Sequence, residues 1–377
     1  MTYIYYFLLI ILIGYVIYLI YNIFYFKRLE NKKVPQAPFP LPFISIVIAV
    51  RNEEKNIQSC LQSVLNQDYP KDLYEVILVD DHSEDATLKI AKGFQKNSDK
   101  LKIIELKDNI VNSQKKKALT TGIYHSKGKW IAVTDADCVV PTTWLSTLVN
   151  YISNEVAFIA GPVKMQTNSE SWLEKMQALE SSGLVFIAAS NIEAGTPMLC
   201  NGANVLYNKR LFNDVGGFEN IDSVASGDDE LLMHKFHNQC FKIKYCLKKE
   251  AIVETLSCPD LVSFWEQRIR WVSKSKAYKN WRISLAQILV YLANLAVFCG
   301  MIGWLFDKWN WFIPVAFCSL KMLIDFVLLY NATRFLGNQR LLKLFIPTFF
   351  LNIIYVIIIG IAGNFVKKYN WKGRHVN

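Results

Sequence analysis

The segment ISIVIAVRNEE, residues 44–54, begins the part of the chain that decides the fold. Its first seven residues are apolar except for one serine, which is typical of a strand buried on both faces of a sheet. Apolar residues with helical spacing follow over residues 53–67, and Pro70 closes that helix. A second strand is expected at residues 74–80. The chain therefore begins a strand–helix–strand unit at residue 44.

The same alternation continues to about residue 150. Further strands are predicted at residues 101–106 and 130–134. Further helices are predicted at residues 86–94, where Ser83 is a plausible N-cap, at residues 116–125, and from Thr143 onward. Strands that alternate with short helices predict an α/β fold with a doubly wound, mostly parallel sheet. In such a sheet ligands bind beyond the carboxyl ends of the strands.

Long uncharged segments lie on both sides of this region. Residues 3–26, 283–306 and 344–366 contain no charged side chain, and residues 309–330 are interrupted only by Lys321 and Asp325. About 20 apolar residues are enough to cross the hydrocarbon core of a bilayer. The sequence therefore predicts an integral membrane protein with a lipid bilayer as partner, and it excludes a purely soluble class.

These boundaries divide the chain into six parts. They are a transmembrane helix at 1–26, a proline-rich linker at 27–42, an α/β domain at 43–260, an amphipathic interface helix at 261–282, transmembrane helices at 283–366 and a basic tail at 367–377. Basic residues directly after the first segment predict a multi-pass protein of the cell membrane with a cytoplasmic α/β domain. Three later spans would put the basic tail outside, so one apolar segment is a candidate re-entrant or interfacial helix.

Composition removes other classes of protein. The 377 residues are 52% hydrophobic and carry a net charge of +10. The positive excess lies beside the membrane segments and at the C-terminus, which favours anionic lipid over nucleic acid as partner. The eight cysteines are scattered without a Cys-x-x-Cys pair. This pattern predicts reduced cysteines and neither a disulfide framework nor a zinc site.

Acidic pairs follow two of the expected strands. Asp80 and Asp81 end the second strand, and Asp135 and Asp137 lie in TDADC after the fourth. Carboxylates in Asp-x-Asp spacing can bind a hard divalent ion, Mg²⁺ or Mn²⁺, which in turn neutralises a diphosphate. Turns and helix caps produce the same spacing. The position of both pairs at one edge of a nucleotide-binding topology favours the metal site.

Two more motifs follow the α/β region. The acidic cluster Asp228-Asp229-Glu230 opens a helical segment, where acidic residues are also common because they interact with the helix dipole. The motif QRIRW, residues 267–271, lies on the interface helix. Its two arginines are two positions apart, so at most one of them is expected to face a site. Arginine suits diphosphate binding, and tryptophan offers a flat apolar face.

Together the motifs resemble the membrane-bound branch of the family 2 glycosyltransferases, which includes cellulose, hyaluronan, poly-N-acetylglucosamine and ceramide glucosyl transferases. The matching segments in chain order are residues 48–54, 79–87, 134–137, 201–204 with 215–218, 227–230 and 267–271. The resemblance implies a GT-A-type fold and a metal-dependent, inverting transfer of sugar. The implied donor is a nucleotide-sugar, a UDP-sugar by preference, and the implied acceptor is a membrane lipid or a lipid-linked saccharide.

The resemblance also implies a role for each matching residue. The donor-binding residues are Val50, Glu53, Asp81, Lys115, Asp135 and Arg270, with Asp135 and Asp137 as metal ligands. The catalytic residues are Asp229, as general base, and its neighbour Asp228. The acceptor-binding residues are Trp271 and Gln267. Two departures from the family pattern are Gln114, where a glycine is usual before the lysine, and Asp228, where glutamate is usual.

Alternatives remain open at this stage. The QRIRW motif also occurs in processive polysaccharide synthases, and a catalytically dead membrane scaffold could keep the same fold. Lys321 and Asp325 lie on one helical face and form either a structural ion pair or a polar groove for the acceptor headgroup. His234 and His237 are expected to be packed side chains and not metal ligands, because no third soft ligand accompanies them.

Overall fold

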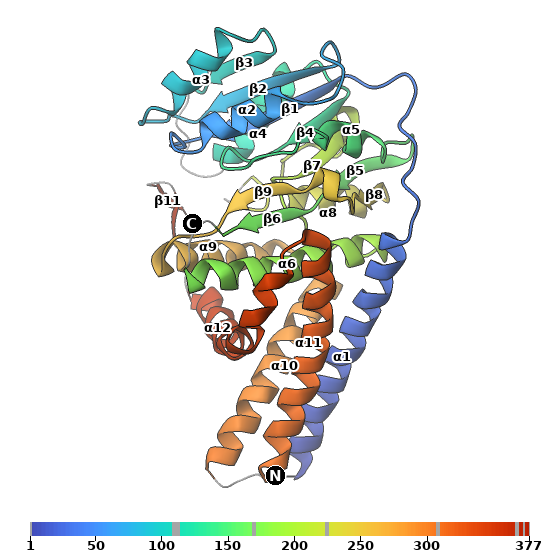
Figure 1. The fold of residues 1–377 in the computed structure, drawn as a ribbon, viewed down its shortest axis with the longest axis vertical. Coiled ribbons are helices and arrows are strands. Elements are labelled where there is room, and N and C mark those ends of the chain that lie inside the picture. Colours follow the sequence, from blue (N-terminus) through green and yellow to red (C-terminus); the bar gives the residue numbers. More distant parts are fainter. Residues whose placement is uncertain are drawn as a thin grey trace.

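The computed structural model describes residues 2–107, 114–167, 171–222, 226–306, 310–365, 369–371 and 374–376. Three levels follow one another along the long axis of the molecule (Figure 1). An α/β domain forms one end, a layer of transverse helices lies beneath it, and three long helices form the other end. The N-terminus lies at the far end of the long helices, whereas the C-terminal strands lie beside the α/β domain.

A seven-stranded sheet forms the centre of the α/β domain. Its strands are β1 (Ile44–Val50), β2 (Tyr74–Asp80), β3 (Leu101–Glu105), β4 (Trp130–Val133), β5 (Val156–Ala160), β7 (Val205–Asn208) and β8 (Lys242–Tyr245). They are arranged in the order β3-β2-β1-β4-β7-β5-β8. All neighbours are parallel except β7, which runs antiparallel to β4 and β5. The predicted α/β fold with a mostly parallel sheet is confirmed.

Short helices pack on this sheet. They are α2 (Ile57–Leu65), α3 (Thr87–Gln95), α4 (Gln114–His125), α5 (Trp144–Val149), α7 (Lys209–Asp214), α8 (Glu230–Asn238) and the 3₁₀ turn η1 (Lys249–Ala251). The predicted apolar face of α2 is buried, from Ile57 to Val64. Ser83 does not cap α3. The Asp85 carboxylate accepts the Thr87 N–H at 2.9 Å, whereas the Ser83 hydroxyl accepts the Asn52 N–H at 3.1 Å.

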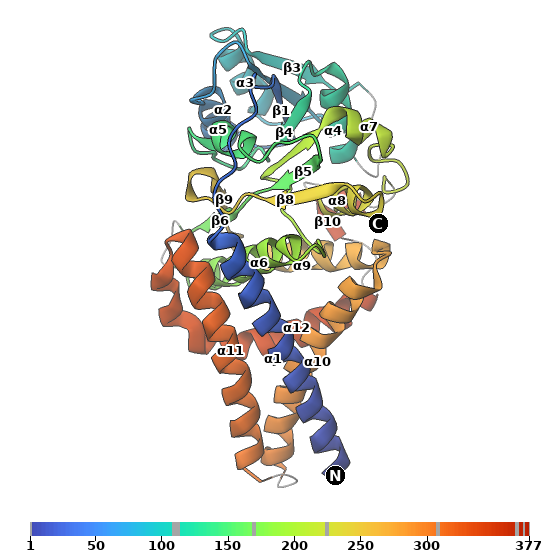
Figure 2. The same cartoon turned by 90° about the vertical axis from the view of Figure 1, so that its right-hand side faces the viewer.

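The transverse layer contains three helices: α6 (Trp172–Glu193), α9 (Leu261–Ser273) and α12 (Phe345–Phe365) (Figure 2). A two-stranded sheet of β6 (Val163–Gln166) and β9 (Val253–Leu256) lies between this layer and the main sheet. The strands β10 (Tyr369–Trp371) and β11 (Arg374–Val376) pair with each other beside α9.

The predicted continuous interface helix at 261–282 is wrong. α9 ends at Ser273, and a 3₁₀ turn, η2 (Lys274–Ala277), follows it. At this point Lys274 pairs with the Glu230 carboxylate at 2.9 Å. A new helix then begins with Asn280 as N-cap, whose side chain accepts the N–H of Arg282 at 3.0 Å.

Three long helices run side by side away from the transverse layer: α1 (Thr2–Glu30), α10 (Trp281–Leu305) and α11 (Phe312–Leu336). α1 extends four residues into the expected linker and ends at an ion pair between Glu30 and Arg334, at 2.7 Å. Each of the three is long and apolar enough to cross a membrane. The fourth segment that meets this criterion, residues 339–363, contains the 3₁₀ turn η3 (Gln339–Leu344) and most of α12.

α12 differs from the other three because it crosses their direction beneath α6 and α9 (Figure 2). Two glycines allow this close crossing. A side chain at Gly363 would clash with Val272 of α9, and a side chain at Gly360 would clash with Tyr291 of α10. The prediction that one apolar segment is not an ordinary span therefore has a structural counterpart in α12.

Candidate active site

The carboxyl ends of β1 and β2 bring the predicted nucleoside residues together. Val50, the last residue of β1, accepts the N–H of Asp81 through its carbonyl at 2.8 Å. Glu53 donates its backbone N–H to the Thr87 hydroxyl at 2.7 Å, and its carboxylate accepts the Asn56 side-chain amide at 2.7 Å. The three residues predicted to bind the nucleoside thus lie on neighbouring loops at one edge of the sheet.

Arg51 supports these loops, although the sequence did not single it out. Its guanidinium is buried and donates to the carbonyls of Asp81 at 2.8 Å and His82 at 2.9 Å. Asn52 and His82, which follow β1 and β2, have φ values of 50° and 56°. Residues other than glycine rarely adopt this left-handed conformation, and functional sites are where such strain concentrates.

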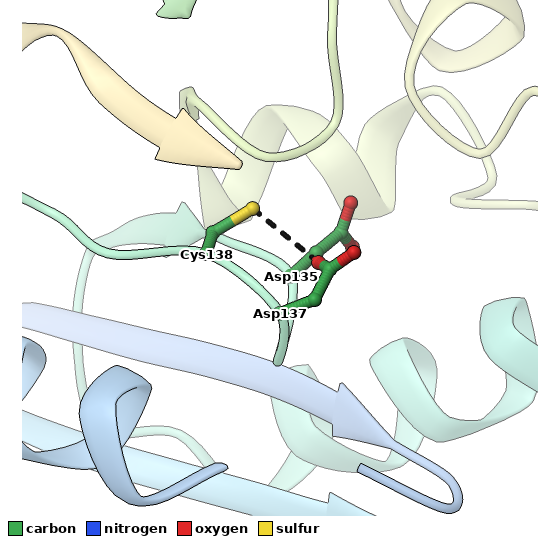
Figure 3. A group of neighbouring side chains, drawn as sticks. All are labelled: Asp135, Asp137 and Cys138. Carbon is green, nitrogen blue, oxygen red and sulfur yellow. Dashed lines mark hydrogen bonds between the residues drawn. The ribbon is translucent and has the colours of Figure 1, made fainter. Parts of the chain in front are cut away.

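The loop after β4 carries the candidate metal site (Figure 3). One ligand atom each from Asp135, Asp137 and Cys138 lie within 4.8 Å of one another. The Cys138 thiol donates to the Asp137 carboxylate at 3.4 Å. Burial raises the pKa of Cys138 well above its ordinary value, and the two aspartates add to the shift, so the thiol is neutral. The two carboxylates are hard oxygen donors and fit Mg²⁺ or Mn²⁺.

Lys115 connects the candidate metal site to the acidic cluster. Its ammonium lies 2.8 Å from an oxygen of Asp135 and 3.0 Å from an oxygen of Asp228. Burial lowers the pKa of Lys115, but the two carboxylates outweigh burial, and the pKa lies well above its ordinary value. The predicted position of Lys115 near the phosphates is consistent with this geometry.

Lys116 follows Lys115 in the chain, in a run of lysines that is usually a sign of a solvated helix face, but it is not solvated. The side chain is buried, and its ammonium donates to the carbonyls of Ile221 at 2.7 Å and Ser226 at 3.0 Å. Burial lowers the pKa of Lys116 to about 8. Lys116 therefore supports the segment that leads into Gly227 and Asp228, whereas Lys115 faces the candidate site.

Asp229 is the N-cap of α8. Its two carboxylate oxygens accept the N–H of Glu230 and the N–H of Gly202, both at 2.7 Å. Gly202 permits this approach, because a Cβ at that position would lie 3.3 Å from the Asp229 Cβ. Burial raises the pKa of Asp229, and its acidic neighbours Asp228 and Glu230 add to the rise while Lys274 opposes it. A carboxylate held in this way has the properties of a general base.

The neighbouring carboxylates have ionic partners. Burial raises the pKa of Asp228, but Lys115 outweighs burial, and the net pKa lies below its ordinary value. Glu230 pairs with Lys274 at 2.9 Å and accepts the Tyr278 hydroxyl at 2.7 Å. The sequence did not single out Lys274 or Tyr278, because they lie in the segment between α9 and α10 that was expected to be helical.

The two arginines of the QRIRW motif point in different directions, as predicted. Arg268 is buried, pairs with Glu180 at 2.5 Å, and lies 4.2 Å from the centre of the Trp271 ring. Arg270 lines the central cavity together with Gln267 and Trp271. The structure thus brings both predicted acceptor residues and one predicted donor residue to the same cavity.

One cavity of about 1000 Å³ connects these groups. It is lined by Lys115, Asp135 and Asp137, then by Asp228 and Asp229, and it continues past α9 to residues of α1, α10, α11 and α12. The predicted nucleoside residues Val50, Glu53 and Asp81 are not part of this lining. The structure therefore places the residues predicted as metal ligands, base and acceptor contacts in one cavity, and the residues predicted to bind the nucleoside at a neighbouring part of the sheet edge.

His234 is a packed side chain, and Lys321 forms an ion pair at the cavity. Burial lowers the pKa of His234 to about 4, and its ring nitrogen lies 2.9 Å from the Met198 carbonyl, which confirms the prediction of a packed histidine. Lys321 pairs with Asp325 at 2.5 Å, and Asp325 also accepts the Tyr15 hydroxyl at 2.6 Å. The ion pair is present, and Asp325 and Tyr15 also line the cavity, so the structure fits both the structural pair and the polar groove.

The chain is similar to one protein family and to several known glycosyltransferases and synthases. Residues 45–216 match the family described as glycosyl transferase family 2. Over 191 residues the chain is 34% identical to glycosyltransferase AglE of Haloferax volcanii, covering 50% of this chain and 59% of that protein. Over 335 residues it is 25% identical to poly-beta-1,6-N-acetyl-D-glucosamine synthase of Staphylococcus epidermidis, which covers 82% of this chain and 78% of that protein. Over 232 residues it is 29% identical to beta-monoglucosyldiacylglycerol synthase of Trichormus variabilis, which covers 61% of this chain and 48% of that protein.

The chain thus spans less than two thirds of the length of AglE and of the Trichormus protein. Among solved structures, a mannosyltransferase from Pyrobaculum calidifontis in complex with GDP-Man and Mn²⁺ superposes with a TM-score of 0.61 at 18% identity. The superposition covers 96% of this chain and 99% of that chain. At this identity the likeness shows the fold, and the predicted GT-A-type fold is confirmed.

Proposed function

We propose that this chain, of which residues 45–216 match glycosyl transferase family 2, transfers a sugar from a nucleotide-sugar to a membrane lipid acceptor with inversion at the anomeric carbon. The observation that carries the proposal is the cavity shared by Asp135, Asp137, Asp229 and Arg270. It joins a diphosphate-binding set, a carboxylate base and a path toward the membrane helices.

The reaction needs one base and one cationic surface. Asp229 takes the proton of an acceptor hydroxyl as its oxygen forms a bond to the anomeric carbon of the donor. The bond between that carbon and the diphosphate breaks in the same step, and the nucleoside diphosphate leaves. A single displacement inverts the anomeric centre, and the raised pKa of Asp229 makes it a stronger proton acceptor than an ordinary aspartate.

Positive charge stabilises the departing diphosphate. Arg270 can form two parallel hydrogen bonds to phosphate oxygens, and Lys115 adds a second cation beside Asp135. Asp135 and Asp137 would hold a divalent ion, which would supply further neutralisation of the diphosphate. Asp228 keeps Lys115 in position from the other side.

The membrane arrangement supports a cytoplasmic site. Basic residues at the end of α1 favour the cytoplasmic side. α10 then leads away from the domain and α11 returns toward it, while α12 stays transverse at the domain side. With three spans, the basic tail lies on the same side as the catalytic domain, which removes the conflict between span number and tail charge.

The proposal is tested with purified protein in nanodiscs and a panel of radiolabelled UDP- and GDP-sugars, with Mn²⁺ and total membrane lipid as acceptor. The expected result is a labelled lipid that forms with the wild-type chain and not with Asp229→Asn. Product length separates the related alternative: a labelled polymer would identify a polysaccharide synthase. Absence of donor turnover in both proteins, with the full panel, would favour a scaffold.

A further inference from the structure

The lower half of the cavity reaches deep into the membrane helices. It is lined there by Tyr15 of α1, Asp325 of α11 and one face of α12. Tyr15 lies 15 residues before the end of α1 at Glu30, which corresponds to about 22 Å at 1.5 Å per residue. Since the hydrocarbon core is about 30 Å thick, the cavity reaches the level of acyl chains.

The polar side chains of α12 lie on its cavity side. Thr348, Asn352 and Tyr355, at helical spacing of four and three residues, line the cavity among apolar residues of the same helix such as Phe349 and Val356. The exposed side chains of the helix are all large and apolar. They are Ile346, Phe350, Leu351, Ile354, Ile358 and Ile361, of which Ile361 also borders the cavity. A transverse helix with this division presents apolar side chains to lipid and its polar side chains, here called its polar face, to the cavity.

The polar face is made of uncharged groups. The Thr348 hydroxyl is buried and has no hydrogen-bond partner among the described residues. An unpaired buried hydroxyl costs about 1–3 kcal/mol, so such groups normally find a partner. Thr348 therefore has spare capacity to bond a polar group inside the cavity. Asn352, one turn further along the same face, can both donate and accept.

The charges around the cavity disfavour an anionic acceptor. Lys115 is shared by Asp135 and Asp228, Lys274 pairs with Glu230, and Lys321 pairs with Asp325. Arg270 is the remaining cation of the described lining without a carboxylate within ion-pair distance, and the leaving diphosphate requires it. A second phosphate, carried by a lipid phosphate or a diphosphate-linked saccharide, would meet an excess of carboxylates.

We propose that the lower half of the cavity binds the headgroup of an uncharged, hydroxyl-bearing lipid, a glycerolipid or glycolipid, through Thr348 and Asn352. This inference rests on the proposed function and narrows the class of lipid that serves as its acceptor. The excess of carboxylates in the cavity lining disfavours a lipid phosphate and a lipid diphosphate-linked saccharide as acceptors. The headgroup hydroxyl would be directed upward to Asp229, and the polar face of α12 would bind the remaining hydroxyls.

Photo-crosslinking tests this inference without knowledge of the donor. The full chain in phosphatidylcholine nanodiscs is irradiated with diazirine-bearing monoglucosyl dioleoylglycerol or with polyprenyl phosphate that carries the same reporter. Labelled peptides are mapped by mass spectrometry. We expect the glucolipid to label α12, and Thr348→Val and Asn352→Leu each to reduce that labelling about tenfold, the loss expected for one hydrogen bond.

The controls separate binding from folding. Thr348→Val keeps the side-chain shape and removes an unpaired hydroxyl, so its melting temperature should not fall. Ile354→Val, on the lipid-facing side of the same helix, should leave labelling unchanged. Preferential labelling by the polyprenyl phosphate, no labelling by either probe, or unchanged labelling of Thr348→Val and Asn352→Leu would overturn the inference.

Nucleotide binding distinguishes a failure of the acceptor assignment from a failure of the proposed function. Binding of UDP and GDP with Mn²⁺ is measured on the same nanodiscs by calorimetry. If nucleotide binds and the glucolipid does not label α12, the acceptor assignment fails alone. If neither nucleotide binds, the proposed function fails with it.

Discussion

Replacing Asp229 by asparagine tests the assigned base with little change in shape. The carboxylate accepts two N–H groups at 2.7 Å, from Glu230 and Gly202. The asparagine carbonyl can keep one of these bonds, while its NH₂ group faces the other donor. The lost bond costs about 1–3 kcal/mol. Removal of a buried charge offsets part of this cost, because burial raises the pKa of Asp229 and thus disfavours its anion.

The effect on catalysis should be much larger than the effect on stability. A positioned general base contributes about 10²- to 10⁴-fold, which corresponds to about 2.7–5.5 kcal/mol of activation free energy. We expect kcat to fall by this factor, and the dissociation constant for nucleotide with Mn²⁺ to stay within about threefold of wild type, a difference below 1 kcal/mol. Transfer of radiolabelled sugar to extracted lipid gives kcat, and calorimetry gives nucleotide affinity.

The pH profile adds a second readout. Because the pKa of Asp229 is raised, its protonation removes the base at a higher pH than for an ordinary aspartate, and activity should fall on the acid side from that higher pH. Asp229→Asn should lose this acid limb together with most of its rate. An Asp229→Asn protein that binds nucleotide normally and keeps more than about a tenth of kcat, less than the loss expected for a general base, would refute the reasoning.

The remaining predictions concern the donor site and the membrane helices. Lys115→Met should raise the KM for the nucleotide-sugar about tenfold or more, since a charge-assisted contact of about 1.5–3 kcal/mol is lost, and steady-state kinetics at saturating acceptor checks this. Asp137→Asn should abolish Mn²⁺-dependent tightening of nucleotide binding in calorimetry, and equal tightening would contradict its role as ligand. Asp325→Leu should lower the melting temperature more than the double replacement of Lys321 and Asp325 by leucine, because it leaves an unpaired buried ammonium. The double variant should lose transfer to lipid and keep donor hydrolysis. A cysteine placed after residue 371 should react with a membrane-impermeant maleimide only when the cytoplasmic face is accessible.

Local patterns predicted the α/β domain well. The bounds of β1 and β2 agree with the predicted strands, because continuous β-branched sequence has few alternatives in a buried parallel sheet. The antiparallel direction of β7 was not predicted, since a four-residue apolar strand carries no signal for direction. Ser83 was a plausible cap, but Asp85 lies closer to the first helical N–H groups.

The site could be predicted only where motifs carried it. Asp135, Asp137, Asp229 and Arg270 line one cavity, as the resemblance implied. The aspartates follow β4 or precede α8, whereas Arg270 lies inside α9 and only its motif indicated the site. The contacts of Lys116 and Lys274 were not predicted. Lys116 bonds the backbone carbonyls of Ile221 and Ser226, which side-chain patterns do not reveal. Lys274 pairs with Glu230, which is distant in sequence. The transverse course of α12 depends on close packing at two glycines and could not be read from its hydropathy.

The anomeric configuration of the product tests the central claim most directly. Nanodisc-bound protein with Mn²⁺ and an α-linked nucleotide-sugar should produce a β-linked glycolipid, visible in the coupling constant of the anomeric proton by NMR. The nucleoside diphosphate should appear in equal amount. An α-linked product would contradict the single displacement at Asp229, and release of free sugar without any glycolipid would contradict the assignment of a lipid acceptor.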